Sequence, residues 1–319
     1  MKKVLITGAS GFAGSFLIEH LLLNKSFQIS GTFLLEKSLK NLIHVKNKIN
    51  LIHLDLIDAE KVRTMIEKLR PDFIFHLAAH PSPMASFENP GETMMNNIKA
   101  QINILEAVKT LEFWKSRILV VSSAEIYGLV SPDDLPIDEK TELKPTSPYS
   151  VSKITQDFLG LQYYLAHKLK IVRVRPFNHI GPKQSPSFVV SAFAKKIAEI
   201  EKNNSEPVMS VGNLESMRDF TDVRDMIRAY VLAIEKGEAG DVYNIGSGQA
   251  YKISDILDQL ISLSSKKIRV NVDEKLLRPI DIPELRCDAG KFQKLTGWKP
   301  EIPLEKTLED TLDYWRNIT

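Results

Sequence analysis

The sequence has one cysteine and no long hydrophobic run, and each absence excludes a class of protein. Cys287 alone cannot form an internal disulfide, which favours a reducing compartment. No apolar stretch approaches the ~20 residues that a membrane-spanning helix needs. The apolar run near the N-terminus is broken by the glycine-rich segment 8–14 before it reaches the length of a signal peptide. We therefore expect a cytoplasmic protein with no membrane partner.

The sequence also lacks an excess of either charge. Its 42 Lys and Arg residues nearly balance 40 Asp and Glu residues, so the net charge is only +2. Such a balance leaves no electrostatic footprint for nucleic acid, and we expect no nucleic-acid partner. An anionic ligand would have to be held by a few local groups. At 319 residues the chain exceeds the size at which one hydrophobic core stops growing, which predicts two linked lobes.

Short apolar segments alternate with helical patterns through the first half of the chain. Strand patterns lie at 4–7, 27–32, 49–54, 73–77, 118–122 and 171–175, and helical patterns at 12–23, 59–69, 93–111 and 149–169. This alternation predicts an α/β fold, in which a Rossmann-type doubly wound parallel sheet is covered by helices on both faces.

We place this first domain at 1–177 and a smaller C-terminal α/β substrate-binding lobe at 178–319. The chain is expected to return to the first domain around 213–246. In the second half, helical patterns lie at 188–202, 222–236, 253–264 and 304–315, and strand patterns near Val208 and Val242. Prolines and glycines crowd segment 176–186, which predicts a loop that shapes a site.

A glycine-rich turn separates the first strand pattern from the first helical pattern. Gly8, Gly11 and Gly14 have the spacing Gly-x-x-Gly-x-x-Gly. Glycines allow the backbone to turn tightly and to approach a pyrophosphate, whose charge meets the free amides at a helix N-terminus. Close packing of a helix on a strand also demands small residues, but the strand–turn–helix context favours a dinucleotide site.

No carboxylate ends the second strand pattern, where an NAD enzyme usually carries one for the ribose hydroxyls. Glu36 comes too late, whereas Lys37 and Lys40 could face a 2′-phosphate. The sequence therefore favours NADP(H), with NAD(H) as the alternative. Asp55, at the end of the third strand pattern, either accepts a hydrogen bond from adenine or caps the following helix.

Tyr149 and Lys153 lie four residues apart, so a helix would place both on one face. An ordinary phenol has a pKa near ~10, and a neighbouring ammonium lowers this pKa because it favours the phenolate. Ser123 follows a strand pattern and could steady a substrate oxygen by a hydrogen bond. Together with the glycine-rich turn, these three residues predict hydride transfer at a carbonyl or carbinol carbon.

These residues lie in motifs through which the chain resembles the extended short-chain dehydrogenase/reductase family over essentially its whole length. The motifs are His-Leu-Ala-Ala at 76–79, a helix headed by Asn97, Ser-Ser-Ala-Glu-Ile-Tyr-Gly at 122–128 and Ser-Pro-Tyr-Ser-Val-Ser-Lys at 147–153. The second half resembles the members that reduce GDP-4-dehydro-6-deoxy-D-mannose, through the segments at 175–182, 211–215, 218–225 and 277–279. The resemblance implies a homodimer formed through the helices at 93–111 and 149–169.

The resemblance also implies where a cofactor and a nucleotide sugar, expected to be GDP-linked, would bind. The expected cofactor-binding residues are Gly8, Ser10, Gly11, Phe12, Ala13, Gly14, Thr32, Asp55, Leu56, Leu77, Ala78, Ala79, Asn97, Tyr149, Lys153 and Pro176. The expected substrate-binding residues are Ser82, Ser86, Ser123, Asn178, Val189, Arg218, Arg278 and Asp281. No metal site is expected.

Two arginines are implied to hold the diphosphate of the nucleotide sugar together with Asn178. The forked guanidinium groups of Arg218 and Arg278 match phosphate oxygens. The alternative for Arg218 is a salt bridge with Asp219 or Asp222, and for Arg278 a turn before proline. Two positions depart from the pattern of the related reductases, since Lys183 replaces a glycine and Asp281 a glutamate.

The segment after Ser123 distinguishes two reactions within the family. The related 4,6-dehydratases use a glutamate two residues after the serine or threonine, with an acidic or hydroxyl side chain between them. This chain keeps Glu125 but has Ala124, which cannot donate a proton. Glu125 stays a candidate catalytic residue, and it is alternatively a relic of the dehydratase reaction, a proton relay or a structural carboxylate bonded to loop amides.

We therefore predict an NADPH-dependent reduction of the C4 ketone of a GDP-4-keto-6-deoxyhexose, which yields GDP-D-rhamnose or its C4 epimer. Tyr149 would supply the proton, with His80 as an alternative acid. The alternative functions are a nucleotide-sugar 4,6-dehydratase or 4-epimerase. A non-catalytic dinucleotide sensor is a further alternative, although the intact Ser123, Tyr149 and Lys153 argue against it.

Overall fold

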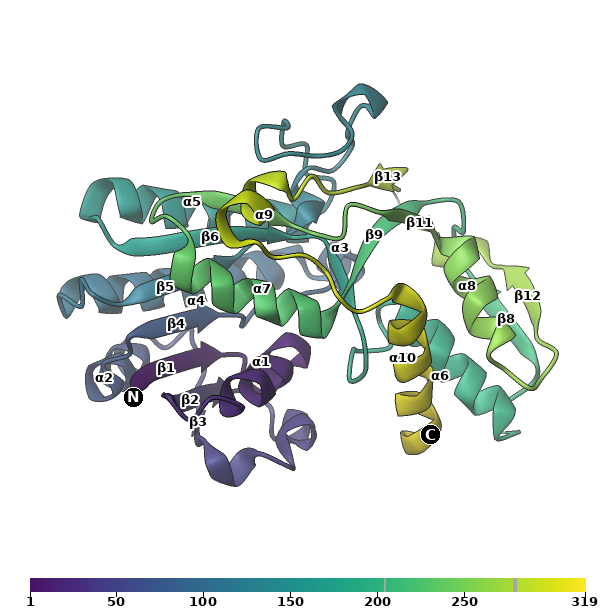
Figure 1. The fold of residues 1–319 in the computed structure, drawn as a ribbon, viewed down its shortest axis with the longest axis horizontal. Helices are drawn as coiled ribbons and strands as arrows, with labels where there is room; N and C mark the ends of the chain where they lie inside the picture. Colours follow the sequence, from purple (N-terminus) through teal and green to yellow (C-terminus); the bar gives the residue numbers. More distant parts are fainter. Residues whose placement is uncertain (204, 278–279) are drawn as a thin grey trace.

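Seven parallel strands form the central sheet of the computed structural model, which describes residues 1–203, 205–277 and 280–319 (Figure 1). The strand order is β10-β6-β5-β4-β1-β2-β3, so the chain runs outward from β1 in both directions. The strands are β1 (Lys2–Thr7), β2 (Phe27–Phe33), β3 (Asn50–His53), β4 (Phe73–His76), β5 (Arg117–Val121), β6 (Lys170–Pro176) and β10 (Val242–Ile245). This sheet confirms the predicted fold class.

Helices cover both faces of this sheet because its strands bury side chains on both sides. In β1, Val4 and Ile6 belong to one core and Leu5 to the other. The Val4 side is covered by α1 (Phe12–Leu22) and α7 (Val223–Lys236). The Leu5 side is covered by α2 (Ala59–Leu69), α4 (Pro90–Thr110) and α5 (Pro148–His167). The short helix α3 (Pro83–Glu88) packs against α4 and α5.

A second group of elements has its own core, lined by α6, α8 and α10. Its helices are α6 (Val189–Glu201), α8 (Ile253–Ser262) and α10 (Leu304–Ile318), and α10 lies beside α6 in Figure 1. Its strands are β7 (Asn178–Ile180), β8 (Val208–Val211), β9 (Met217–Asp222), β11 (Ala250–Lys252), β12 (Arg269–Val272) and β13 (Glu284–Leu285). Between these elements the chain returns to the main sheet with α7 and β10, and α9 (Gly290–Thr296) packs against both. The exact division into two domains stays a prediction.

The expected helices of the first half occur within a few residues of their predicted ends, and α2 has the predicted bounds. The short strands β9, β11, β12 and β13 and the helices α3 and α9 were not predicted. Segment 176–186 was expected to be a loop, but it contains β7, which pairs with β9.

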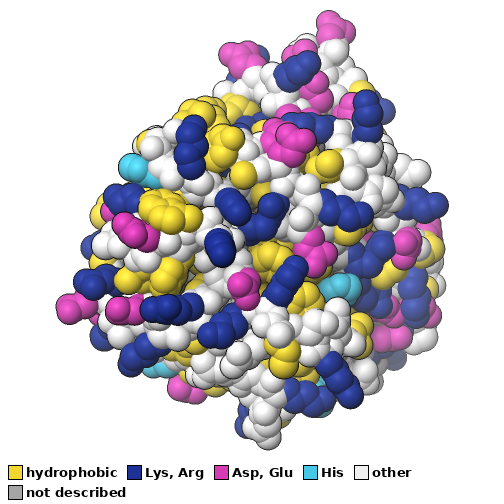
Figure 2. Space-filling view, turned by 60° about the vertical axis from the view of Figure 1, so that its left-hand side comes forward, with side chains coloured by type: hydrophobic (Ala, Val, Ile, Leu, Met, Phe, Trp, Pro, Cys, Tyr) yellow, Lys and Arg dark blue, Asp and Glu magenta, His cyan; other side chains and the backbone are white. Residues whose placement is uncertain are grey.

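Within the described residues, no helix combines the length and the apolar character that crossing a membrane requires. Acidic and basic side chains both occur across the face shown in Figure 2, in keeping with the near-zero net charge.

Candidate active site

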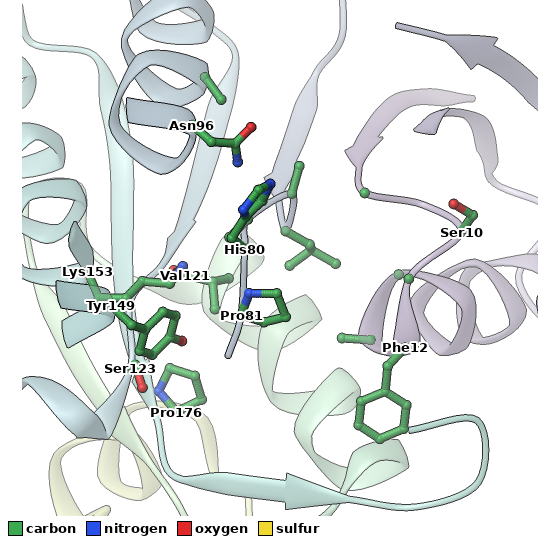
Figure 3. A pocket seen from close by; sticks show the side chains of 18 of the residues that line it. Ser10, Phe12, His80, Pro81, Asn96, Val121, Ser123, Tyr149, Lys153 and Pro176 are labelled. Atoms are coloured by element: carbon green, nitrogen blue, oxygen red, sulfur yellow. The ribbon is translucent and has the colours of Figure 1, made fainter. Parts of the chain in front are cut away.

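A cavity of about 480 Å³ lies over the carboxyl ends of the central strands. Strands β1 and β4 lead the chain away from this edge in opposite directions, which is where α/β sheets bind their ligands. Figure 3 shows Tyr149, Ser123 and Pro176 at one end of the cavity and Phe12 and Ser10 at the other. The cavity therefore joins the glycine-rich turn to the predicted catalytic residues.

The glycine-rich turn is packed too tightly for other residues. Gly8 has φ +66°, and a Cβ there would lie 2.9 Å from the Cα of Ala78. A Cβ on Gly14 would lie 2.3 Å from the carbonyl oxygen of Gly8. Helix α1 begins after Gly11 without a side-chain cap, so its first amides are available to a ligand in the cavity. This cradle fits the pyrophosphate of a dinucleotide.

The end of the cavity that lies away from Tyr149 is lined by serine hydroxyl groups and not by the expected lysines. Lys37 and Lys40 are exposed on the 3₁₀ helix η1 (Glu36–Leu42) and do not line the cavity. Ser38 does line it, and its Oγ lies 2.6 Å from the Oγ of Ser10. Asn41 donates to the backbone oxygen of Ser10 at 2.9 Å. The fold of η1 brings Ser38 back to the turn, which the sequence pattern did not indicate.

Asp55 lines the cavity, and the helix that follows it is capped by a different residue. The side chain of Asp58 accepts the amide of Lys61 and is the N-cap of α2. The alternative of a helix cap at Asp55 is therefore wrong, and the contact with adenine stays a prediction.

Tyr149 and Lys153 are held in the first turns of α5 by a capping box at Ser147 and Ser150. Both side chains line the cavity and are buried. The Lys153 Nζ donates to the carbonyl oxygen of Val121 at 2.9 Å and lies 6.0 Å from the centre of the Tyr149 ring. Ser123, just after β5, lines the same cavity.

Burial sets the protonation of this pair. It lowers the pKa of Lys153 to about 7. Burial also raises the pKa of Tyr149 well above its ordinary value, against the hydrogen bond with Ser123, and the charge of Glu125 raises it further. The expected lowering of the Tyr149 pKa is thus wrong for the unliganded protein, because desolvation outweighs the hydrogen bond with Ser123. Tyr149 is a protonated donor at neutral pH.

The two residues after Ser123 both line the cavity. Ala124 is only 2% exposed and packs in a core with Ile126 and Tyr127. The Glu125 carboxylate lines the cavity and forms no hydrogen bond or ion pair with another described residue. The alternative of a structural carboxylate bonded to loop amides is therefore wrong.

Asn97 is buried behind the cavity wall and does not line it, unlike its neighbour Asn96. Its Oδ1 accepts the amide of His80 at 2.7 Å, and its Nδ2 donates to the Oγ of Ser152 at 3.0 Å. Asn97 thereby ties the loop after β4 to the helix that carries Tyr149. The structure places it as a support for the cavity and gives it no surface for a cofactor.

The predicted substrate residues fall into two groups. Ser123 and Asn178 line the cavity, whereas Ser82, Ser86 and Val189 do not. Ser82 caps α3, and the buried Ser86 Oγ accepts the amide of Tyr149 at 3.1 Å.

The second group lies in the C-terminal part of the chain. Arg218 donates to the carbonyl oxygen of Ile282 at 2.8 Å and lies 3.4 Å from Asp281, which also accepts from Asn213. Among the described residues, the acidic partner of Arg218 is Asp281, and not Asp219 or Asp222, which were the expected alternatives. Arg278 lies outside the described residues.

Several cavity residues were not predicted, among them His179, Gln184 and Tyr230. His179 stacks on Phe12, with ring centres 5.8 Å apart and an angle of 4° between the planes. Gln184 donates to the carbonyl oxygen of His179 at 2.9 Å. Tyr230 reaches the cavity from α7. The loop 176–186 gave a signal for the first two, whereas the helical pattern at 222–236 gave no signal that sets Tyr230 apart.

Comparisons with known proteins agree with this geometry. The model of the family described as GDP-mannose 4,6 dehydratase matches residues 5–311. The GDP-6-deoxy-D-mannose reductase of Pseudomonas aeruginosa is 33% identical over 82% of this chain and 86% of its own length. The solved structure of RMD from Pseudomonas aeruginosa complexed with NADPH has a TM-score of 0.87 and 30% identity over all of both chains.

A UDP-glucose 4-epimerase from Thermotoga maritima, solved with UDP-glucose, has a TM-score of 0.88 and 25% identity over 99% of each chain. The family consists of NAD(P)-dependent enzymes that act on sugar nucleotides, which confirms the predicted enzyme class and the use of a nicotinamide dinucleotide. The match over nearly the whole chain, the relative at 33% identity and the cavity that joins the glycine-rich cradle to Tyr149 and Lys153 agree with one another. The chain belongs to the GDP-mannose 4,6 dehydratase family of short-chain dehydrogenases/reductases.

Proposed function

We propose that the protein reduces the C4 ketone of a GDP-4-keto-6-deoxyhexose with NADPH. The observation that carries this proposal is the buried methyl of Ala124, which offers no proton beside the catalytic residues. A 4,6-elimination needs such a proton to help water leave, whereas a ketone reduction does not. The similarity to a GDP-6-deoxy-D-mannose reductase supports the same reaction.

The side chains at the cavity fit the roles that a reduction needs. A bound NADPH supplies the hydride. Tyr149, kept protonated by burial, donates its proton to the ketone oxygen as negative charge develops there. Ser123 orients that oxygen by a hydrogen bond. Lys153, anchored to the Val121 carbonyl, is placed to hold the nicotinamide ribose and to return a proton to Tyr149.

The nucleotide sugar is proposed to reach this end of the cavity from the C-terminal lobe. Asn178 lines the cavity, and Arg218 and Asp281 form a polar pair in the same lobe. We also propose that the protein forms a homodimer through α4 and α5.

The proposal is tested with purified protein, NADPH and GDP-4-keto-6-deoxymannose. We expect loss of NADPH absorbance and, by NMR, a product reduced at C4. A Tyr149→Phe variant should lower kcat by about two to four orders of magnitude while it still binds NADPH. Dehydration of GDP-mannose without NADPH consumption would overturn the proposal.

A second candidate, a 4,6-dehydratase, is favoured by the position of Glu125. Its carboxylate lines the cavity and is not paired within the described residues, as a base for C5 would require. A Glu125→Gln variant separates the two functions. For the reductase, we expect ketone reduction within about threefold of wild type, whereas a dehydratase would lose about two to four orders of magnitude.

A further inference from the structure

A second phenol reaches the cavity from the face of the sheet opposite to Tyr149. Tyr149 is on α5, which covers the Leu5 side, and Tyr230 is on α7, which covers the Val4 side. Both line the same cavity over the carboxyl edge of the sheet. Tyr230 is 1% exposed, so almost all of its ring lies in the core and little more than one edge of the side chain meets the cavity.

The hydroxyl of Tyr230 differs from those of other buried tyrosines in the described part of the chain. The Tyr127 hydroxyl donates to Asn244 at 2.7 Å, and the Tyr243 hydroxyl accepts the amide of Glu238 at 3.0 Å. No hydrogen bond joins the Tyr230 hydroxyl to another described residue, nor is this oxygen sealed from solvent. A buried hydroxyl without a partner is costly, so this group is matched by a ligand or water in the cavity.

The position of α7 indicates which part of a dinucleotide lies over Tyr230. Helix α7 packs against α1 on one side and against β5 and β6 on the other. The cavity residues at the adenosine end, Ser38 and Asp55, follow β2 and β3 on the far side of β1. Tyr230 therefore lies between the glycine-rich turn and Tyr149, on the side of the cavity away from Ser38 and Asp55.

We propose that Tyr230 is a binding residue for the nicotinamide half of the dinucleotide, with its hydroxyl donating to an acceptor oxygen of that half. Burial and the nearby Tyr149 raise the pKa of Tyr230 above its ordinary value, so the hydroxyl stays a donor. The proposal rests on dinucleotide binding, which is independent of the sugar that is reduced.

The test is a Tyr230→Phe variant, which removes one oxygen and keeps the ring. We expect the Kd for NADPH, measured by fluorescence, to rise about five- to tenfold, as for the loss of one hydrogen bond. The Kd for 2′,5′-ADP, the adenosine half alone, should stay within twofold of wild type. The unliganded Tm should not fall, because no bond within the described residues is lost, whereas the increase in Tm caused by NADPH should shrink.

Tyr243→Phe is a matched control, since Tyr243 belongs to the same core but its hydroxyl has a partner. We expect this control to lower the unliganded Tm and to leave the Kd for NADPH unchanged. For a measurement that needs no substitution of the phenol, 3-fluorotyrosine placed at position 230 should shift its ¹⁹F resonance with NADPH and not with 2′,5′-ADP. An unchanged NADPH affinity in Tyr230→Phe, or equal losses for NADPH and 2′,5′-ADP, would overturn the proposal.

Discussion

At the scale of single residues, burial controls the protonation of Lys153. Its pKa of about 7 in the folded protein lies below the ordinary value of 10.5. Between these values the unfolded chain binds more protons than the folded chain, so the free energy of unfolding rises with pH. Below pH 7 the lysine is charged in both states, and the buried ammonium then lowers the free energy of unfolding by the full amount that corresponds to the difference between the two pKa values.

A Lys153→Met variant removes this contribution. We expect the variant to have a higher free energy of unfolding than the wild type. This difference should be greatest near pH 6 and should shrink as the pH rises toward 10. Each pKa unit corresponds to about 1.4 kcal/mol, so the change is measurable by urea unfolding at several pH values. A difference that stays constant over this pH range would contradict the burial of a charge at Lys153.

Residue types and spacing were sufficient to predict that Ser123, Tyr149 and Lys153 lie at one site, because helical periodicity and the motif around each are local. The direction in which the Tyr149 pKa shifts could not be predicted from the sequence, because it depends on how much of the chain closes over the phenol. The position of Tyr230 at the cavity was missed for a related reason. An aromatic residue on an amphipathic helix has the same pattern whether its tip meets a core or a cavity.

At the scale of elements, a buried ion pair fixes the catalytic helix to the sheet. Asp157, one turn after Lys153 on α5, is fully buried and contacts Arg173 and Arg175 of β6, the latter at 2.8 Å. Removing the carboxylate leaves two buried guanidinium groups without their counter-ion. We expect Asp157→Asn to cost about 3–5 kcal/mol of unfolding free energy, measured by urea denaturation.

The control is Lys61→Ala, which breaks a pair with Asp58 on the surface of α2, where the lysine side chain is 73% exposed. Such pairs contribute about 0–1 kcal/mol. If both variants lost the same small amount of stability, Asp157 would have no anchoring role.

Elements with a clear periodicity were predicted well, and those whose buried residues are polar were not. Helix α2 has an apolar stripe with polar residues opposite, and its predicted bounds are the observed ones. Strand β9 is mostly buried but contains Arg218, Asp219 and Asp222. The Asp219 carboxylate accepts the amides of Gly248 and Cys287, at 2.8 and 3.1 Å. Such burial depends on partners far along the chain, and no local pattern reports it.

At the scale of the whole molecule, the outer surface of α5 favours assembly. Phe158 and Leu165, about two helical turns apart, have 49% and 58% of their surfaces exposed. Leu161 lies between them on the same shallow apolar surface. A partner that covers this strip would remove apolar area from water, which is the driving force of most protein association.

We expect the wild-type protein to have the mass of a dimer by light scattering and a double variant, Phe158→Glu with Leu165→Glu, to have the mass of a monomer. Two carboxylates facing two others across a two-fold axis would be desolvated and would repel each other. Val272→Glu is the matched control, because this exposed apolar residue lies on β12 in the C-terminal lobe, far from α5 in Figure 1. It should stay dimeric. A wild-type monomer, or a double variant that remains a dimer, would show that α5 is not the interface. Because Tyr149 and Lys153 lie on the same helix, a monomeric variant with normal NADPH affinity would also show that the cavity is complete within one chain.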